Sequence, residues 1–262
     1  MMYFWTYLGL GATSVAAGAM NAIAGGGTLL TFPALDAALL QMGFRETSKA
    51  ANMTSTVALV PGSMASAFGF RRDLVQCRAW VLLLTIPSLL GGAFGSWLLM
   101  TLPDSTFKAV VPWLVLFAVG LFIAQPWIIG WVRRHRPTGP PSTMTKAGVV
   151  IAQFFIATYG GYFGAGIGII MLSTLGLLDL PSIHAMNAVK TFLGSCINGI
   201  SVLFFAFSGQ VVWPIALLMA VFAIAGGYLG AVLSLRLKPQ SVRWVVIAIG
   251  ITCAVYFFRQ QR

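Results

Sequence analysis

The chain has 262 residues, of which 58% are hydrophobic and only 8% are charged. Because soluble domains average about 25% charged residues, this composition excludes a soluble protein and indicates a single membrane domain over residues 1–262. The net charge of +11 does not indicate nucleic-acid binding, since much of the Lys and Arg lies in short segments between apolar runs, where it sets membrane orientation.

Ten apolar runs follow one another along the chain, and most of them have the length of a membrane-spanning helix. Strands of a membrane barrel would read as alternating segments of about 10 residues, which these runs do not resemble. We therefore predict an all-α polytopic membrane protein. The runs cover residues 4–24, 28–41, 53–70, 79–100, 108–130, 147–163, 167–179, 187–207, 211–235 and 243–258.

Two of the runs, 28–41 and 167–179, are short. As helices they would reach only about 20 Å, less than the hydrocarbon core of about 30 Å. Each follows a glycine cluster, Gly25–Gly27 in the first case and Gly160–Gly168 in the second. Such clusters predict either breaks whose backbone faces a cavity or close helix packing by small residues.

The chain reads as two homologous halves, residues 4–130 and 147–258, joined by the hydrophilic linker 131–146. The motif GGxxG begins at Gly91 and again at Gly226, 135 positions later, and Asn52 and Asn187 share this offset. Internal repeats with matched, glycine-interrupted segments are typical of transporters whose substrate site lies between the repeats.

The number of crossings, eight or ten, stays open. With ten crossings the halves are inverted, and ten Lys and Arg residues face inside against five outside. If each short run merges with its predecessor, there are eight crossings, with nine Lys and Arg residues inside and six outside. Both arrangements place residues 71–78 and 131–146 in the cytoplasm by the positive-inside rule.

Four motifs together resemble the TauE/SafE sulfite exporter family over residues 11–258. They are the segments AAGAMNAIAGGGTLLTFPAL, ANMTSTVALVPGSMASAFGFRRDL and NAVKTFLGSCINGISVLFFAFSG and the GGxxG runs. The resemblance implies a multi-pass permease of the bacterial cell membrane, built from two homologous halves. It also implies export of small sulfur-containing or organic anions, such as sulfite or sulfoacetate.

Lys190 lies within an apolar run, where a charge is costly and typically faces a partner or a water-filled path. Lysine and neutral hydroxyl and amide donors suit an oxyanion. The alternatives are that Lys190 snorkels to the interface and that the asparagines cap helices. The predicted substrate-binding residues are Lys190, Asn52, Asn187, Ser55, Thr56, Thr191, Gly26, Gly27, Gly166 and Gly168.

Asp36 and Asp179 are acids near the ends of the short runs. Either could pair with Lys190 or carry a coupling proton, or could simply mark a loop edge. The sequence contains no nucleophile–base pair, metal-ligand spacing or nucleotide motif, so we expect neither an enzyme nor a cofactor. The expected partners are a small anion and the bilayer. A coupling ion (proton or sodium) and a homo-oligomer stay open as further partners. A passive anion channel stays open as an alternative function.

Overall fold

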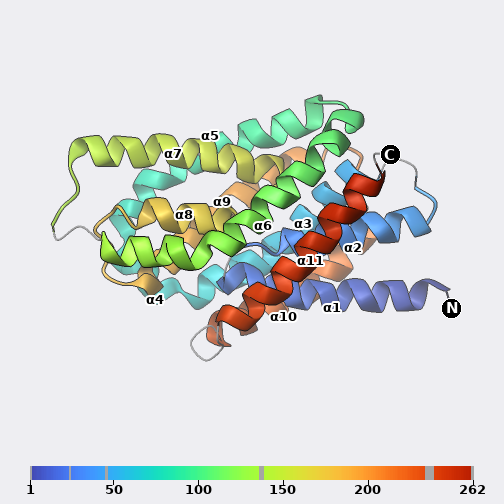
Figure 1. Ribbon diagram of the computed structural model, residues 1–262, viewed down its shortest axis with the longest axis horizontal. Helices are drawn as coiled ribbons and strands as arrows, with labels where there is room; N and C mark the ends of the chain where they lie inside the picture. The colour runs from blue at the N-terminus through green and yellow to red at the C-terminus, as the bar shows by residue number, and fades with distance from the viewer. Residues whose placement is uncertain (1, 24, 45–46, 136–138, 234–238, 261–262) are drawn as a thin grey trace.

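The computed structural model describes the chain except for residues 1, 24, 45–46, 136–138, 234–238 and 261–262, and the described part is helical, without strands (Figure 1). This confirms the predicted all-α fold. The helices are α1 Met2–Ile23, α2 Thr28–Gln41, α3 Ser48–Gly69, α4 Arg71–Gln76, α5 Arg78–Thr101, α6 Asp104–Arg134, α7 Thr143–Tyr162, α8 Ile167–Leu175, α9 Ile183–Phe205, α10 Trp213–Leu233 and α11 Pro239–Gln260.

In the described part of the chain, each of the ten apolar runs forms one helix, and the six-residue α4 is the single addition. Helix α6 continues to Arg134 and α7 begins at Thr143, so both helices extend into the range 131–146. The hydroxyl of Ser142 caps α7 by accepting from the Thr145 backbone N–H at 3.1 Å. Among the described residues, four helices are long and apolar enough to cross a membrane, judged by length and composition: Arg78–Thr101, Asp104–Val132, Ile183–Phe205 and Trp213–Val232.

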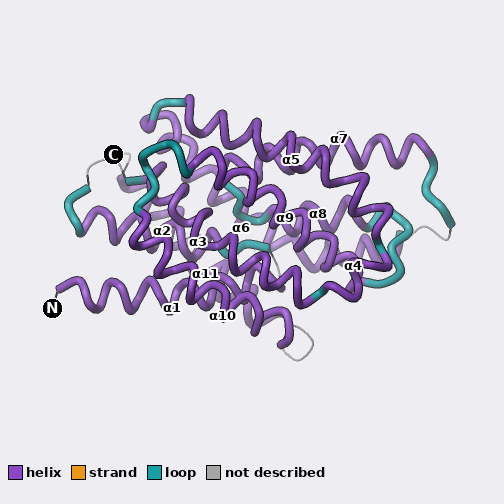
Figure 2. The backbone as a smooth tube through the Cα atoms, turned by 180° about the vertical axis from the view of Figure 1, so that it is seen from behind, coloured by secondary structure: helices purple, strands orange, loops and turns teal. Residues whose placement is uncertain are grey.

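The short helices α2 and α8 fold back on the helices that precede them. Ala34, Ala38 and Gln41 of α2 line a surface hollow together with Trp5 and Leu10 from the start of α1. The two helices are therefore antiparallel, and α8 returns along α7 in the same manner (Figure 1). Seen from behind, the loops gather at the two ends of the bundle, while the two breaks lie in its interior (Figure 2). The short helices thus do not continue the direction of the helices that precede them.

The packing of the long helices interleaves the two parts of the chain. Helix α5 packs against α7 and α9, whereas α10 packs against α1 and α3. The GGxxG motifs make these contacts close: a Cβ at Gly95 would lie 2.0 Å from the Thr158 carbonyl oxygen, and one at Gly227 would lie 2.2 Å from the Gly62 carbonyl oxygen. These glycines serve helix packing.

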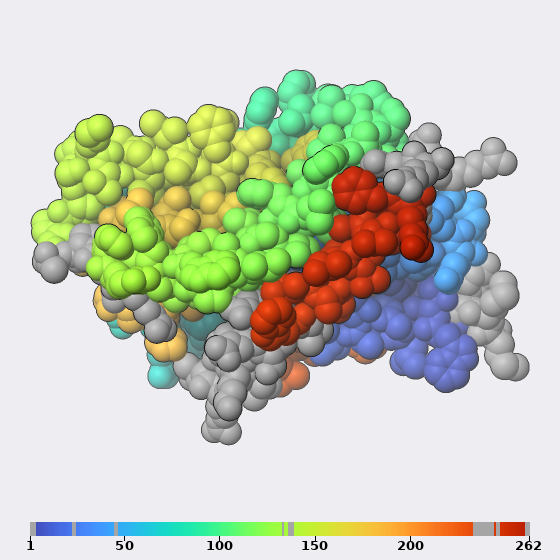
Figure 3. Space-filling view, viewed as in Figure 1, coloured from blue at the N-terminus to red at the C-terminus, as the bar shows by residue number. Residues whose placement is uncertain are grey.

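Helix α3 lies at the centre, in contact with α1, α2, α9 and α10. It is buried along most of its length even though many of its side chains are small or polar. On the face shown in Figure 3, α6 and α11 lie across the molecule. Phe257 of α11 stacks on Phe32 of α2, so α11 covers the short helix from this side.

Candidate functional site

The two glycine breaks meet in the interior. Gly25 and Gly166 have φ values of +73° and +79°, which glycine adopts without a Cβ clash. A Cβ at Gly25 would lie 2.7 Å from the Cα of Gly168, so the backbones of the two breaks touch. Helix α6 packs against both breaks, through Phe122 at Gly26 and Ala118 at Gly166.

A buried cavity lies where the breaks meet. It encloses about 30 Å³, the space of one or two water molecules. Asparagine, threonine and serine side chains and one lysine form its polar wall, and no carboxylate lines it. Its lining residues are Asn21, Gly25, Thr28, Ser63, Gly164, Ile167, Gly168, Met171, Lys190, Thr191, Gly194 and Asn198.

Both short helices begin at this cavity. Thr28 is the first residue of α2, and Ile167 and Gly168 are the first two of α8; all three line the wall. The first N–H groups of a helix have no partner within the helix, and the helix dipole makes this end positive. Two such ends converging on one cavity favour a bound anion.

Lys190 lies in the cavity wall and is only 2% exposed. Its Nζ donates to Asn187 Oδ1 at 3.2 Å and to the carbonyl oxygen of Ala22 at 3.5 Å. Ala22 lies in the last turn of α1, and the free carbonyls of a helix C-terminus attract a cation. The ammonium therefore points into the protein, and the snorkelling alternative is wrong.

Thr191 lies next to Lys190 on the same wall and is 6% exposed. Its hydroxyl has no hydrogen-bond partner among the described residues. A buried polar group without a partner costs about 1–3 kcal/mol, and the large majority of buried polar side-chain atoms have one. The hydroxyl is thus available to a ligand in the cavity.

The predicted polar residues of α3 do not line the cavity. Asn52 donates from Nδ2 to the carbonyl oxygen of Tyr162 at 3.1 Å, at the end of α7. Ser55 is hydrogen-bonded to Thr31 of α2, and Thr56 donates to the Asn52 carbonyl oxygen. The Asn52 and Ser55 contacts fix α3 to α7 and α2, whereas the Thr56 bond lies within α3.

The helix-capping alternative for the two asparagines is also wrong. The residue before α3 is Thr47, and Asn52 lies more than a turn inside the helix. Helix α9 is capped by Ser182, whose hydroxyl accepts from the Ala185 backbone N–H at 3.0 Å. Asn187 instead holds the Lys190 ammonium.

Among the predicted glycines, Gly168 lines the cavity, whereas Gly26, Gly27 and Gly166 form the breaks around it. The N–H of Gly27 donates to Asn21 Oδ1 at 2.7 Å. The predicted set lacks four polar residues that lie on the wall: Asn21, Thr28, Ser63 and Asn198. The signal for Asn21 was its place in the last turn of an apolar helix, four residues before the glycine cluster.

The two predicted acids differ in position. Asp36 is fully buried between α2 and the start of α3, whereas Asp179 is exposed in the loop after α8. Neither lines the cavity. Within the described ranges, no group of three or more His, Cys, Asp or Glu residues could hold a metal ion.

A polar cavity between two broken segments is typical of membrane transporters. Residues 10–257 match the sulfite exporter TauE/SafE family, and the chain belongs to this family. This confirms the resemblance seen in the sequence motifs.

Curated relatives carry corresponding names. The chain is 30% identical to a "Probable membrane transporter protein" of Haemophilus influenzae, over 88% of this chain and 86% of the relative. It is 27% identical to "Probable membrane transporter protein ORF9" of Sinorhizobium sp, over 91% of this chain and 87% of the relative. It is 26% identical to "Probable membrane transporter protein YfcA" of Escherichia coli K12, over 89% of this chain and 82% of the relative. No solved structure gives a significant match.

Proposed function

We propose that the protein exports a small anion, such as sulfite, sulfoacetate or a related oxyanion, through the central cavity. The observation that carries this proposal is the convergence of two helix N-termini and Lys190 on one buried cavity. The family supports a membrane transporter and a role other than catalysis. The single lysine, with neutral groups around it, compensates one negative charge better than two.

The cavity wall offers the groups that an oxyanion binds. Lys190 supplies an ammonium, Thr191 a free hydroxyl, and Asn21 and Asn198 amide groups. Sulfite has three oxygen acceptors that these donors can share. With room for one or two water molecules, the cavity must widen to admit an ion of four heavy atoms.

Two larger hollows at opposite ends of the bundle support a transport cycle of alternating access. The first, the Lys49 hollow, has a volume of about 580 Å³ and is lined by residues 44, 49–50, 102–104 and 209–214. The second, the His184 hollow, has a volume of about 460 Å³ and is lined by residues 69–70, 73, 182, 184 and 231–232. Lys49 and His184 are 135 positions apart, the offset of the proposed repeat.

The charge distribution supports a membrane orientation. Arg71, Arg72 and Arg78 lie at the end of the molecule that contains α4, together with Arg134 and Lys146. The positive-inside rule assigns this end, with residues 71–78 and 131–146, to the cytoplasm of a bacterial inner membrane. The Lys49 hollow then faces the outside.

The decisive experiment measures the melting temperature of the detergent-purified protein with sulfite, thiosulfate, sulfoacetate, sulfate and carboxylates. A ligand that binds only the folded state raises this temperature. We expect a shift for at least one monovalent oxyanion and its loss in Lys190→Ala. The control Lys146→Ala removes an exposed cation from α7 and should keep the shift.

If the anion still raised the melting temperature of Lys190→Ala by the wild-type amount, this lysine would not be part of the binding site. The transport step is measured in proteoliposomes, where a carrier shows saturating flux and acceleration by anion on the opposite side. Single-channel currents would instead indicate a passive anion channel and contradict alternating access.

A further inference from the structure

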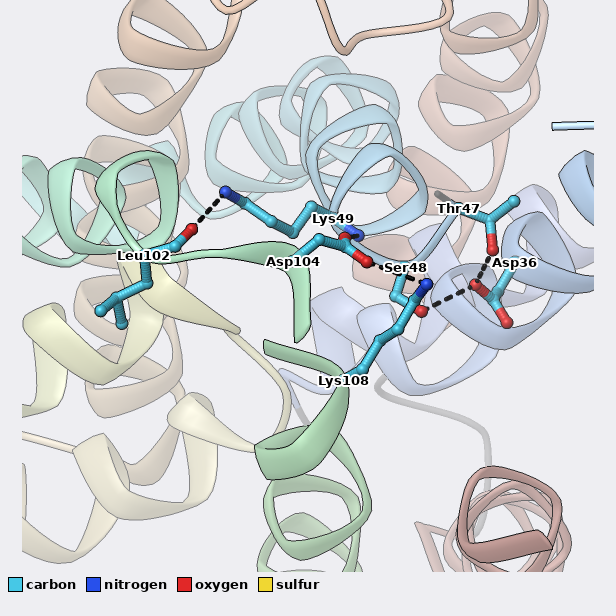
Figure 4. Close-up of polar contacts among 7 residues, drawn as sticks. All are labelled: Asp36, Thr47, Ser48, Lys49, Leu102, Asp104 and Lys108. Atoms are coloured by element: carbon cyan, nitrogen blue, oxygen red, sulfur yellow. Dashed lines mark hydrogen bonds and ion pairs between the residues drawn. The ribbon is translucent and has the colours of Figure 1, made fainter. Parts of the chain in front are cut away.

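We propose that Asp36 is the proton-binding site that couples anion movement to a pH gradient, acting through the contact between α2 and α3. This proposal rests on the proposed transport function and adds its coupling ion. Figure 4 shows the Asp36 carboxyl group with its hydroxyl partners Thr47 and Ser48 and the charged side chains nearby.

The carboxyl group of Asp36 is 0% exposed. Its Oδ1 accepts from the Thr47 hydroxyl at 2.7 Å and from the Ser48 hydroxyl at 3.1 Å. Its Oδ2 has no hydrogen-bond partner in the described structure. A buried carboxylate needs partners for both oxygens, whereas a neutral acid carries its proton on one of them. Oδ2 is the atom that would hold the proton.

The charged groups that act on this carboxyl come from α6. Lys108 favours the ionised form and Asp104 opposes it, and these two residues form an ion pair at 3.0 Å. The Lys49 ammonium of α3 is directed instead to the carbonyl oxygens of Met100 and Leu102, at 3.3 and 2.8 Å.

The other neighbours of α2 add no charge near Asp36 among the described residues. Helix α1 has no charged residue, and α11 presents Phe257 to α2, with Arg259 exposed. Arg45 and Glu46 lie outside the described residues.

The contact between α2 and α3 links Asp36 to the cavity. Ser48 and Ser55 are seven residues apart on one face of α3, where Ser48 binds Asp36 and Ser55 binds Thr31. Thr28, which begins α2, lines the cavity. Asp36 is eight residues further along α2, about 12 Å away.

This geometry provides a coupling mechanism. Hydrogen bonds to an ionised carboxylate are about twice as strong as those between neutral groups. Release of the proton therefore tightens α2 onto the start of α3, and uptake loosens it. Because the start of α2 forms part of the cavity wall, a movement of this helix changes the anion site.

The proton has a route from one end of the molecule. Lys49, next to Ser48, lines the Lys49 hollow together with Asp104. The hollow thus borders the residue next to Ser48, a hydrogen-bond partner of Asp36. Exchange of the proton is thus expected from this end when α2 and α3 separate.

The test records infrared difference spectra of the lipid-reconstituted full-length protein during a pH jump, without any added anion. We expect the C=O stretching band of a protonated carboxylic acid that disappears as the pH rises. The band is lost in Asp36→Asn and kept in Asp104→Asn, the matched control. A band that is absent from the wild type or unchanged in Asp36→Asn overturns the proposal.

A second measurement follows uptake of sulfite into proteoliposomes with and without a pH gradient, in sodium and in choline medium. We expect the gradient to raise wild-type accumulation about 10-fold in both media and to have no effect in Asp36→Asn, while sulfite exchange persists in this variant. Gradient-driven accumulation in Asp36→Asn, or a requirement for sodium, contradicts the proposal.

Two further results keep the tests separate. If Asp36→Asn does not fold, Ser48→Ala replaces it. Loss of one donor to Oδ1 disfavours the ionised carboxylate, so the infrared titration should shift to higher pH. An unchanged titration in Ser48→Ala contradicts the assignment. If no anion in the panel binds, the transport proposal fails, whereas the infrared band still decides whether Asp36 holds a proton.

Discussion

Two adjacent residues of α9 contribute to the cavity in different ways. Lys190 is held by the Asn187 side chain and the end of α1, so its position is fixed before a ligand arrives. Thr191 exposes its hydroxyl to the cavity without a partner in the described part of the chain. Fixed donors reduce the ordering cost of binding, and the unpaired hydroxyl supplies a contact that the protein itself does not use.

Replacement of Thr191 by valine, which has the same shape, tests this difference. Because the hydroxyl has no protein partner, we expect the free energy of unfolding to stay within about 1 kcal/mol of wild type or to increase. Anion affinity should fall about 10-fold, since a hydrogen bond to a charged group contributes about 1.5–3 kcal/mol.

Titration of the purified variants with the anion identified by the melting-temperature panel checks this expectation. Thr191→Ser keeps the hydroxyl and serves as the control, with affinity near that of wild type. A large loss of stability in Thr191→Val with unchanged affinity would show that the hydroxyl serves the fold.

At the scale of the helices, glycines have two separate roles. One set allows helices to pack closely, and another set interrupts helices. The GGxxG motifs bring α5 onto α7 and α10 onto α1 and α3, where no room is left for a side chain. The breaks at Gly25 and Gly164–Gly166 instead use positive φ values to reverse the chain. Both look alike in the sequence, but only the breaks border the cavity.

Gly95→Ala tests the packing role. Its Cβ would lie 2.0 Å from the Thr158 carbonyl oxygen, which cannot move without displacing α7. We expect a loss of about 2 kcal/mol or more in unfolding free energy, measured by denaturation in detergent.

Gly120→Ala in α6 is the matched control, because no atom lies within 4 Å of its Cβ position. There the higher helix propensity of alanine should leave stability unchanged or raise it by about 1 kcal/mol. Equal stability losses in the two variants would contradict a specific α5–α7 contact.

At the scale of the whole molecule, the small central cavity lies between two larger hollows at opposite ends. An alternating mechanism requires that the cavity opens to one hollow at a time. The interleaved helices suit this requirement, because any movement of α5 or α10 relative to its neighbours changes the contacts of both parts of the chain.

Thiol labelling at both ends tests alternation. Gln210→Cys lies in the Lys49 hollow and His184→Cys in the His184 hollow, and both native side chains are exposed. In a chain whose Cys77, Cys196 and Cys253 are replaced by alanine, we expect a bound anion to change the two labelling rates in opposite directions. Parallel changes at both positions would indicate a pore that is open at both ends.

Hydropathy predicted the helices well because burial in lipid requires long apolar runs. The run ends agree with the helix ends to within a few residues for most elements, and both glycine breaks were located. Helix α4 was missed because its six residues, RRDLVQ, form no apolar run. The return of α2 along α1 depends on side-chain packing that hydropathy does not encode.

The candidate site was predicted in part. The sequence singled out Lys190, Thr191 and Gly168, which line the cavity, but also Asn52, Ser55 and Thr56, which bind α2, α7 and their own helix. Linear position gives the depth of a side chain along a helix and not the neighbour that it faces. The same limit explains why Asn21, an isolated amide in α1, was overlooked.

The central position of α3 has a consequence for biosynthesis. This helix has serine, threonine and asparagine on its buried surface, and its neighbours α9 and α10 are translated more than a hundred residues later. Ser48 and Ser55 find partners on α2, but Asn52 has its partner at the end of α7, and until α7 emerges lipid alone would leave this amide unpaired. Co-translational insertion of the first part therefore yields an unfinished intermediate, and the anion cavity forms only when α9 enters the membrane.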